Sequence, residues 1–184
     1  MQTHQLVAHP AHRPLAVTGV EARWGVIGPW LQLRWKVRGA GQVVLPPFAG
    51  RTRADGLWQA TCGELFVQPH GSEGYAEFNF APSEAFAAYD FAAWREGMAT
   101  RPVSAAPVIT PRKGGGVLYL DVALPLADLP RLPAALSLTM VIAEEGGATS
   151  YWAMAHAHAD RPDFHHPACF GGALVSPPGD EVRH

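Results

Sequence analysis

The sequence has few charged residues and few cysteines, and both shortages exclude classes of protein. Only 16% of its 184 residues are charged while 48% are apolar, so the chain has material for a core and lacks the composition of a disordered segment. Its two cysteines, Cys62 and Cys169, are too few and too far apart in the sequence for a disulfide framework. We therefore expect two reduced, buried thiols.

Basic clusters and long apolar runs are also missing. The net charge is -2, and Lys and Arg do not gather into a dense patch, which argues against a nucleic-acid partner. No segment approaches the roughly 18 apolar residues of a membrane span. The start of the chain is rich in His and Pro and has no apolar stretch of signal-peptide length. We expect a cytoplasmic protein without a membrane partner.

The familiar catalytic motifs are absent as well. The chain has no nucleophile motif, Walker loop or dinucleotide fingerprint, and the glycines at 114–116 lack the strand-to-helix setting of such motifs and predict a turn. Glu64 and Glu77 could supply the paired carboxylates of a glycoside hydrolase. On adjacent strands, however, such a pair more often marks a polar sheet face. We therefore expect no enzymatic activity.

Glycine and proline are frequent and evenly spread. The 17 Pro and 19 Gly break the chain into short segments, which is typical of an all-β domain. Alternation of apolar and polar residues predicts strands at 30–37, 116–124 and 136–143. Further strands are predicted at 15–23, 64–68, 75–80, 86–91, 103–110, 151–155 and 170–175. These strands, about ten in all, would form a β-sandwich of two antiparallel sheets in one domain over 1–184, with loose tails near 1–12 and 177–184.

The sequence pattern of two segments is ambiguous or short, and their secondary structure needs a separate argument. Residues 83–95 fit either a helix capped by Ser83 or a strand. We favour the strand because alternate residues from Phe86 onward share a face. Residues 125–129 suit a single helical turn that Pro130 ends.

A hairpin is predicted between residues 64–69 and 74–80, joined by a short turn rich in Gly and Ser. In the simplest pairing Glu64 lies opposite Asn79, and Glu77 points to the same side. The intervening Leu, Val and Phe residues then fill the other face. A slip of one residue would mix the polar and apolar faces, so the pattern predicts this register.

Two aromatic segments carry the residue types of a sugar site. Trp58 precedes Glu64 by six positions, and Trp152 follows Tyr151 far downstream, at the start of a segment rich in His and Asp. Flat aromatic faces stack on the apolar face of a pyranose, while carboxylate and amide groups such as Asn79 bond its hydroxyls. The alternative is that both tryptophans are ordinary core residues.

The histidines allow a metal site as a second hypothesis. His156 and His158 would point to one face of a strand, with Asp163, His165 and His166 close behind them in the sequence. Calcium would require several oxygen ligands, for which Asp160 and Asp163 are the local candidates. The alternative is a loop in which the imidazoles only bond backbone groups.

Taken together, three stretches resemble a known group of proteins. They are Leu57 to Phe66, Tyr75 to Ser83, and Tyr151 to Gly171, supported by a strand followed by proline at 120–129. They resemble the DOMON-like domains related to family 9 carbohydrate-binding modules, in particular the short single-domain bacterial members. The resemblance covers most of the chain.

The resemblance implies a jelly-roll-like β-sandwich that holds the end of a sugar chain between two tryptophans. Trp58, Trp152 and Glu64 fall on matching positions. The less closely aligned in-plane partners are Asn79 and Arg112. The signature of the small members includes His165 and His166, which either shape the site or brace the loop. The resemblance also admits calcium, and haem held by a Met and a His as in the wider DOMON group, for which Met98 and Met154 are the candidates.

The sequence therefore predicts a non-catalytic module that binds a saccharide or sugar-bearing metabolite, with dissociation constants on the order of micromolar or weaker. Two alternatives stay open. One is a protein that binds zinc, another metal or haem through the histidines at 156–166. The other is an interaction domain whose exposed aromatic patch docks a protein that the sequence does not identify.

Overall fold

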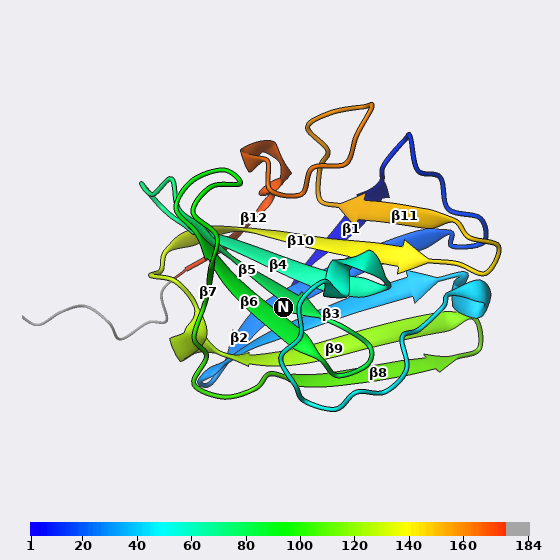
Figure 1. Cartoon of the computed structure of the whole chain (residues 1–184), viewed down its shortest axis with the longest axis horizontal. Coiled ribbons are helices and arrows are strands. Elements are labelled where there is room, and N and C mark those ends of the chain that lie inside the picture. The colour runs from blue at the N-terminus through cyan, green and yellow to red at the C-terminus, as the bar shows by residue number, and fades with distance from the viewer. Residues whose placement is uncertain (176–184) are drawn as a thin grey trace, which may run out of the picture.

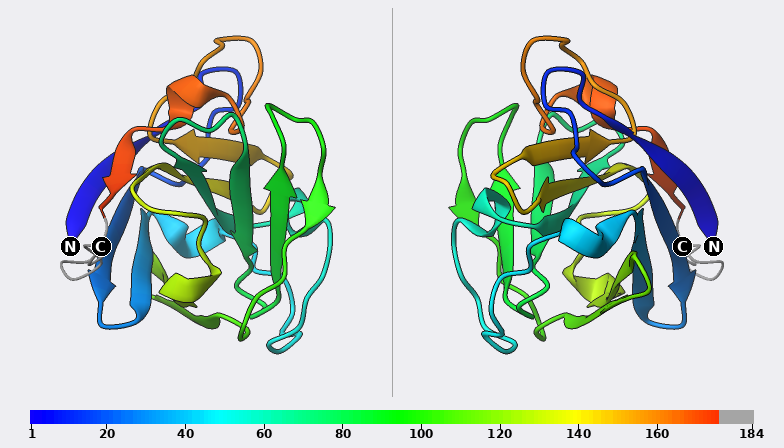
Figure 2. Two further views of the ribbon diagram at one scale, coloured as in Figure 1. Left: turned by 90° about the vertical axis from the view of Figure 1, so that its left-hand side faces the viewer. Right: turned by 90° about the vertical axis from the view of Figure 1, so that its right-hand side faces the viewer.

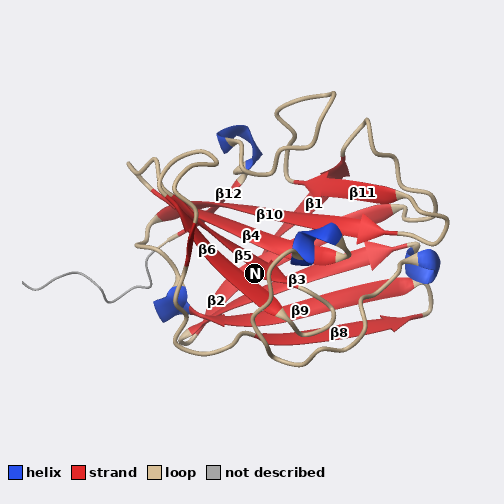
Figure 3. Cartoon of the chain, viewed as in Figure 1, coloured by secondary structure: helices blue, strands red, loops and turns tan. Residues whose placement is uncertain are grey.

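The computed structural model describes residues 1–175, and these are built almost wholly from β-strands joined by turns (Figures 1 and 3). The strands are β1 (Gln2–Ala8), β2 (Gly19–Ile27), β3 (Trp30–Arg38), β4 (Cys62–Pro69), β5 (Tyr75–Phe80), β6 (Phe86–Phe91), β7 (Ala99–Thr100), β8 (Val108–Gly114), β9 (Val117–Pro125), β10 (Ala134–Ala143), β11 (Thr149–Ala153) and β12 (Gly172–Leu174). Short 3-10 turns lie at η1 (Ala40–Gln42), η2 (Leu57–Gln59), η3 (Leu126–Asp128) and η4 (Pro167–Cys169). Within residues 1–175 no helix is long and apolar enough to cross a membrane.

The strands pair antiparallel along one path, in the order β7-β6-β5-β4-β10-β11-β1-β2-β3-β9-β8, and β12 pairs with β10. Strand β1 joins the two halves of this path, because its first residues pair with β2 while Val7 and Ala8 pair with β11. The sheet curls, as the end views show (Figure 2), so its strands surround a common interior. This all-β architecture is consistent with a β-sandwich.

A single large cluster of buried apolar side chains fills the interior, and strands from both halves of the path contribute to it. One close approach is at Gly63 in β4, where a Cβ atom would lie 3.1 Å from Leu120 of β9 and 3.2 Å from Trp35 of β3. Glycine thus lets β4 lie directly against strands far away along the path. Alternation along each strand sends every second side chain into this core and leaves the others on the opposite face.

Most of the predicted strands are confirmed. The predictions for β5 and β6 agree with the structure to the residue, which also settles 83–95 in favour of the strand. The predictions for β3, β9 and β10 agree within about two residues, and those for β4, β11 and β12 overlap the observed strands. The turn at 114–116 and the single 3-10 turn within 125–129 are also present.

Other predictions were wrong in place. Residues 1–12 are not a loose tail, because Gln2–Ala8 form β1 and Leu6 is buried in the core. The strand expected at 103–110 begins only at Val108, since the backbone N–H of Ser104 is held by the Asp128 carboxylate at 2.7 Å in a loop. The tail predicted at 177–184 lies outside the described residues.

The strand predicted from residue 15 begins instead at Gly19, because a carboxylate captures the preceding backbone. Glu144, which is buried, accepts backbone N–H bonds from Leu15 at 2.8 Å, Ala16 at 2.7 Å and Val17 at 3.0 Å. These N–H groups are therefore unavailable to a sheet ladder. The side chain also ties the entry to β2 to the turn between β10 and β11.

Glu144→Gln should destabilise the fold. The amide nitrogen would face a backbone N–H in place of a carboxylate oxygen, which removes charge-assisted hydrogen bonds and sets two donors against each other. We expect the free energy of unfolding to fall by about 2–3 kcal/mol in urea denaturation. The exposed neighbour provides a matched control, and Glu145→Gln should leave stability unchanged. Equal stability of the two variants would contradict the prediction.

Candidate functional site

A cavity of about 410 Å³ lies on the face of the sheet that points away from the main core. We call this the site face; it carries alternate residues of β4, β5, β6, β10 and β11. Two carboxyl groups, Glu64 and Glu77, lie at its floor. Aromatic side chains form half of the remaining lining, namely Trp58, Tyr89, Phe91, Tyr151 and Phe164. The cavity thus combines acidic and aromatic groups in one hollow.

The register of β4 on β5 places the two acids together. As predicted, Glu64 pairs with Asn79 and Phe66 pairs with Glu77, so the two glutamates are diagonal neighbours on the site face. The residues between them, including Leu65 and Phe78, point into the main core. Cross-strand neighbours of this kind lie close enough to interact directly.

Glu64 is nearly fully buried, with 3% of its surface exposed. Its Oε2 accepts a hydrogen bond of 3.1 Å from the Thr139 hydroxyl on β10. Burial raises the pKa of the Glu64 carboxyl well above its usual value, and the nearby charge of Glu77 raises it further. Burial and the neighbouring acid therefore both favour the protonated form of Glu64.

Glu77 faces an uncharged imidazole. The Tyr75 hydroxyl accepts from the backbone N–H of Arg95 at 3.1 Å and shares a hydrogen bond of 2.7 Å with His165 Nδ1, and His165 Nε2 lies 3.6 Å from the Glu77 carboxylate. Burial lowers the pKa of His165 to about 4, so the ring is neutral at pH 7. Burial raises the pKa of Glu77 to about 7, against the opposing effects of the Asn79 amide and Arg95.

Arg95 stands at the side of the cavity and is already paired. Its Nε and Nη2 atoms lie 3.1 and 2.8 Å from one carboxylate oxygen of Asp163. Although burial alone would raise it, Arg95 holds the pKa of Asp163 below its usual value. Arg95 has a φ of 57°, in the left-handed region, where the chain turns after β6. The sequence prediction missed this arginine.

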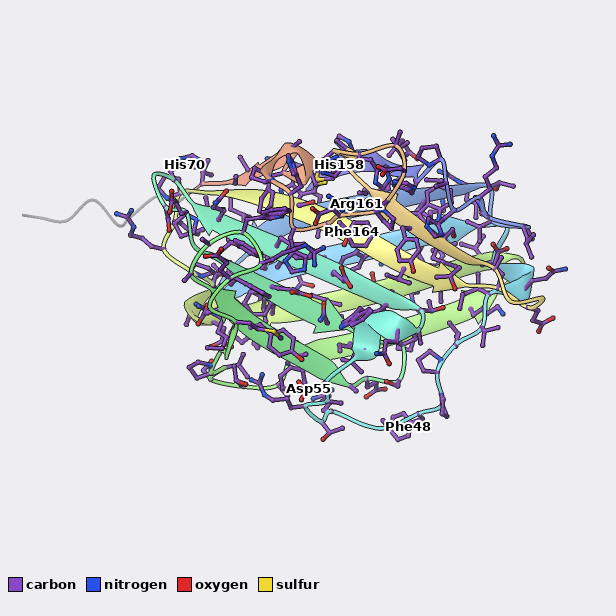
Figure 4. All side chains as sticks on the ribbon, turned by 45° about the horizontal axis from the view of Figure 1, so that its top comes forward. Phe48, Asp55, His70, His158, Arg161 and Phe164 are labelled. Atoms are coloured by element: carbon purple, nitrogen blue, oxygen red, sulfur yellow. The ribbon has the colours of Figure 1, made fainter. Side chains whose placement is uncertain are left out.

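The segment after β11 covers part of the site face (Figure 4). Asp163 accepts the backbone N–H of His165 at 3.2 Å, and its own carbonyl accepts from the Cys169 thiol at 3.2 Å. Ser137 of β10 donates to the Cys169 carbonyl at 2.8 Å. His165 then packs on Phe66 of β4, with ring centroids 5.0 Å apart. The two segments that the sequence singled out therefore do lie side by side, and both cysteines are buried free thiols.

Trp58 reaches the cavity from η2, between β3 and β4. Gly56, with a φ of 71°, permits the turn that begins η2. Tyr89 of β6 donates a hydrogen bond to the carboxylate of Asp55 and so ties this loop to the sheet. The indole is 52% exposed, which leaves a ring surface free for a ligand.

The predicted partner indole is not in the cavity. Trp152 lies on the opposite face of β11 from Tyr151, where it belongs to the main core and is only 5% exposed. Its Nε1 donates a hydrogen bond of 2.9 Å to the Ser150 hydroxyl. Successive residues of a strand point to opposite faces, so only one of Tyr151 and Trp152 can line the cavity, and it is Tyr151. The structure therefore does not bring the two tryptophans together around the cavity.

The other predicted site residues divide between the site and distant positions. His165 lines the cavity, whereas His166 caps η4 by accepting the backbone N–H of Ala168 at 3.1 Å. Asn79 is fully buried on the site face beside the glutamates, and its side-chain atoms have no hydrogen bond of normal geometry among the described residues. Arg112 lies on β8, at the far end of the sheet path, where it binds Asp121 at 2.6 Å. Arg112 therefore does not line the cavity.

The candidate metal ligands have other partners. His156 Nε2 bonds the Val7 carbonyl at 2.8 Å, the carbonyl of His158 bonds the ring of His9, and Asp163 binds Arg95. Within residues 1–175 no group of three or more His, Cys, Asp or Glu side chains is placed to hold a metal ion. These contacts lend the metal hypothesis no support, and calcium and haem binding stay predictions.

Comparison with solved structures identifies proteins of similar fold. One, from Bacteroides uniformis ATCC 8492, carries an inferred assignment as carbohydrate-binding; it aligns with a TM-score of 0.60 and 19% identity over 92% of this chain and 84% of that chain. A family 9 carbohydrate-binding module from Caldicellulosiruptor kristjanssonii in complex with cellotriose aligns with a TM-score of 0.52 and 9% identity, over 97% of this chain and 86% of that chain. A structure of a family 9 module from the same organism in complex with glucose aligns with a TM-score of 0.53 and 9% identity, over 98% of this chain and 88% of that chain. No family model and no curated protein matches the sequence. At these identities the likeness shows a fold like that of family 9 modules.

Glu77→Gln should weaken the dependence of stability on pH. Folding raises the pKa of Glu77 from 4.5 to about 7, so the free energy of unfolding falls as pH rises through that interval. His165, whose pKa is lowered from 6.5 to about 4, acts in the opposite direction below pH 6.5. From about pH 6.5 to about pH 8 the variant should therefore lose about 1 kcal/mol less stability than the wild type in urea titrations. Identical profiles would show that Glu77 keeps an ordinary pKa.

Proposed function

We propose that this chain is a non-catalytic module that binds a saccharide in the cavity on the site face. The observation that carries the proposal is the convergence, in one cavity, of an exposed indole, further aromatic side chains and two buried carboxyl groups. The likeness in fold to family 9 modules, one of them in complex with cellotriose and with glucose, supports it. We extend the proposal to kinship with DOMON-like domains and to a jelly-roll sandwich of two sheets.

The roles of the side chains follow from their positions. Trp58 offers the exposed ring on which the apolar face of a pyranose stacks, and Tyr151 and Phe164 supply further apolar contact from β11 and the segment after it. The carboxyl groups of Glu64 and Glu77 and the His165 imidazole bond the hydroxyls in the ring plane. A few such contacts, set against the cost of ordering the sugar, give dissociation constants on the order of micromolar or weaker.

Trp58→Ala should abolish saturable binding of neutral oligosaccharides such as cellotriose, because the stacking surface is lost. The indole is exposed and belongs to a short 3-10 turn, so the variant should unfold at an unchanged urea concentration. Isothermal titration calorimetry with a panel of β-1,4-linked oligosaccharides measures the effect.

Phe48 provides the matched control for Trp58. It is 77% exposed on the loop before η2 and lies at the outer edge of the molecule, away from Phe164 (Figure 4). Phe48→Ala removes a comparable exposed ring that does not line the cavity. Binding should be retained in this variant. Retention of full affinity in Trp58→Ala would refute the assigned role of the indole.

Trp152→Phe should lower the stability of the fold and leave saccharide binding largely intact. The ring lies in the main core, so the smaller side chain and the lost hydrogen bond to Ser150 should lower the free energy of unfolding by about 1–3 kcal/mol. Saccharide affinity should change less than about threefold, since the indole does not line the cavity. A folded Trp152→Phe protein that had lost sugar binding would restore the two-tryptophan clamp.

A further inference from the structure

Within residues 1–175, neither carboxyl group at the cavity floor forms an ion pair with a Lys or Arg side chain. Glu64 accepts one hydrogen bond, from the neutral Thr139 hydroxyl. Glu77, only 5% exposed and lining the cavity, receives no hydrogen bond of normal geometry from the described residues. Its nearest polar neighbours are the uncharged His165 imidazole at 3.6 Å and the uncharged Asn79 amide, while the charge of Arg95 acts on it from the side of the cavity. The floor thus presents acidic oxygens to whatever enters the cavity.

The positive charge at the side of the cavity is already committed. Arg95 places two nitrogens on one oxygen of Asp163, a carboxylate with only 5% of its side chain exposed. Moving the guanidinium to the glutamates would leave that buried charge without a partner, which is costly. Arg95 is therefore committed to Asp163, and its more distant charge only partly offsets the effect of burial on the pKa of Glu77.

The walls favour the same kind of guest. Five aromatic side chains line the cavity, and their ring faces attract cations through the negative charge of the π systems. Aromatic walls above acidic oxygens are the usual setting in which proteins hold an organic ammonium group. Neutral sugars stack on such rings too, but they leave the acidic pair without a counter-charge.

We propose that the cavity selects a saccharide that carries a protonated amino group, and that this ammonium is seated between Glu64 and Glu77. The inference rests on the proposed saccharide-binding function and narrows its ligand class to amino sugars. A metal ion fits the cavity less well, because calcium takes six to eight oxygen ligands and the floor offers two carboxyl groups among aromatic rings.

Binding of the ammonium releases protons. In the empty cavity burial raises the pKa values of both glutamates, so protons take the place of the missing cation. When the ammonium enters, it stabilises the carboxylates and the displaced proton passes to the buffer. A neutral sugar gives no such release, so proton release distinguishes the two kinds of ligand.

Three trimers with the same β-1,4 linkage test the inference. They are cellotriose, its N-acetylated 2-amino counterpart and the fully deacetylated 2-amino counterpart, of which only the last carries ammonium groups. At pH 6.5 the deacetylated trimer should bind about tenfold or more tighter than cellotriose, as expected for a charge-assisted contact. Calorimetry in two buffers of different ionisation enthalpy should detect proton release for this trimer alone.

Glu77→Gln should remove most of the amine preference while keeping the shape of the side chain. The ratio of affinities should fall to about threefold or less, because the deacetylated trimer should lose more affinity than cellotriose does. Glu73→Gln is the matched control, since it removes the same charge from the exposed turn of the same hairpin and should keep the full ratio. If Glu77→Gln fails to fold, the proton release of the wild type decides the question.

The outcomes separate the two proposals. Equal binding of cellotriose and the deacetylated trimer, with no proton release, overturns the amine preference and leaves the proposed function standing. Failure of all three trimers to bind, with no binding across the neutral panel, overturns the proposed function as well. Stoichiometric binding of Ca²⁺ that displaces the deacetylated trimer would assign the carboxyl groups to a metal instead and also overturns the inference.

Discussion

The pairing of β4 with β5 is the constraint on which the rest of the structure depends. Each strand buries one row of side chains in the main core and presents the other row on the site face. The apolar row holds the register, because a slip of one residue would bring glutamates into the core and phenylalanines out of it. The same register makes Glu64 and Glu77 diagonal neighbours. The same strand register therefore stabilises the core and places two carboxyl groups at the cavity floor.

The carboxyl pair stays buried because other segments cover the site face. Phe164 and His165 come from the segment after β11, Trp58 from η2, and Arg95 from the turn after β6. The Arg95–Asp163 ion pair and the bond from Tyr75 to His165 hold two of these segments against the sheet. They shield the glutamates from water, which raises their pKa values, and they leave a cavity wide enough for a ligand.

The likeness of fold and the local chemistry support the proposed function in different ways. The overall shape aligns with carbohydrate-binding modules at identities too low to carry residue roles across. The cavity, in contrast, is defined by contacts within this chain. The resemblance implied that Trp152 lines the binding site, whereas Trp152 lies in the main core. A module of this fold can thus hold a different ligand on the same scaffold, because loops and strand faces set the chemistry of the site.

Local pattern alone determined the all-β class, most strand positions, the β4–β5 register and the presence of Trp58 and Glu64 in the site, since alternation and turn residues act over a few positions. The tertiary structure decided which face of β11 lines the cavity, so that Tyr151 lies there in place of Trp152. It also brought Arg95 to Asp163 and sent Arg112 to a distant strand. Such choices depend on how far-separated segments pack, which no short window of sequence contains.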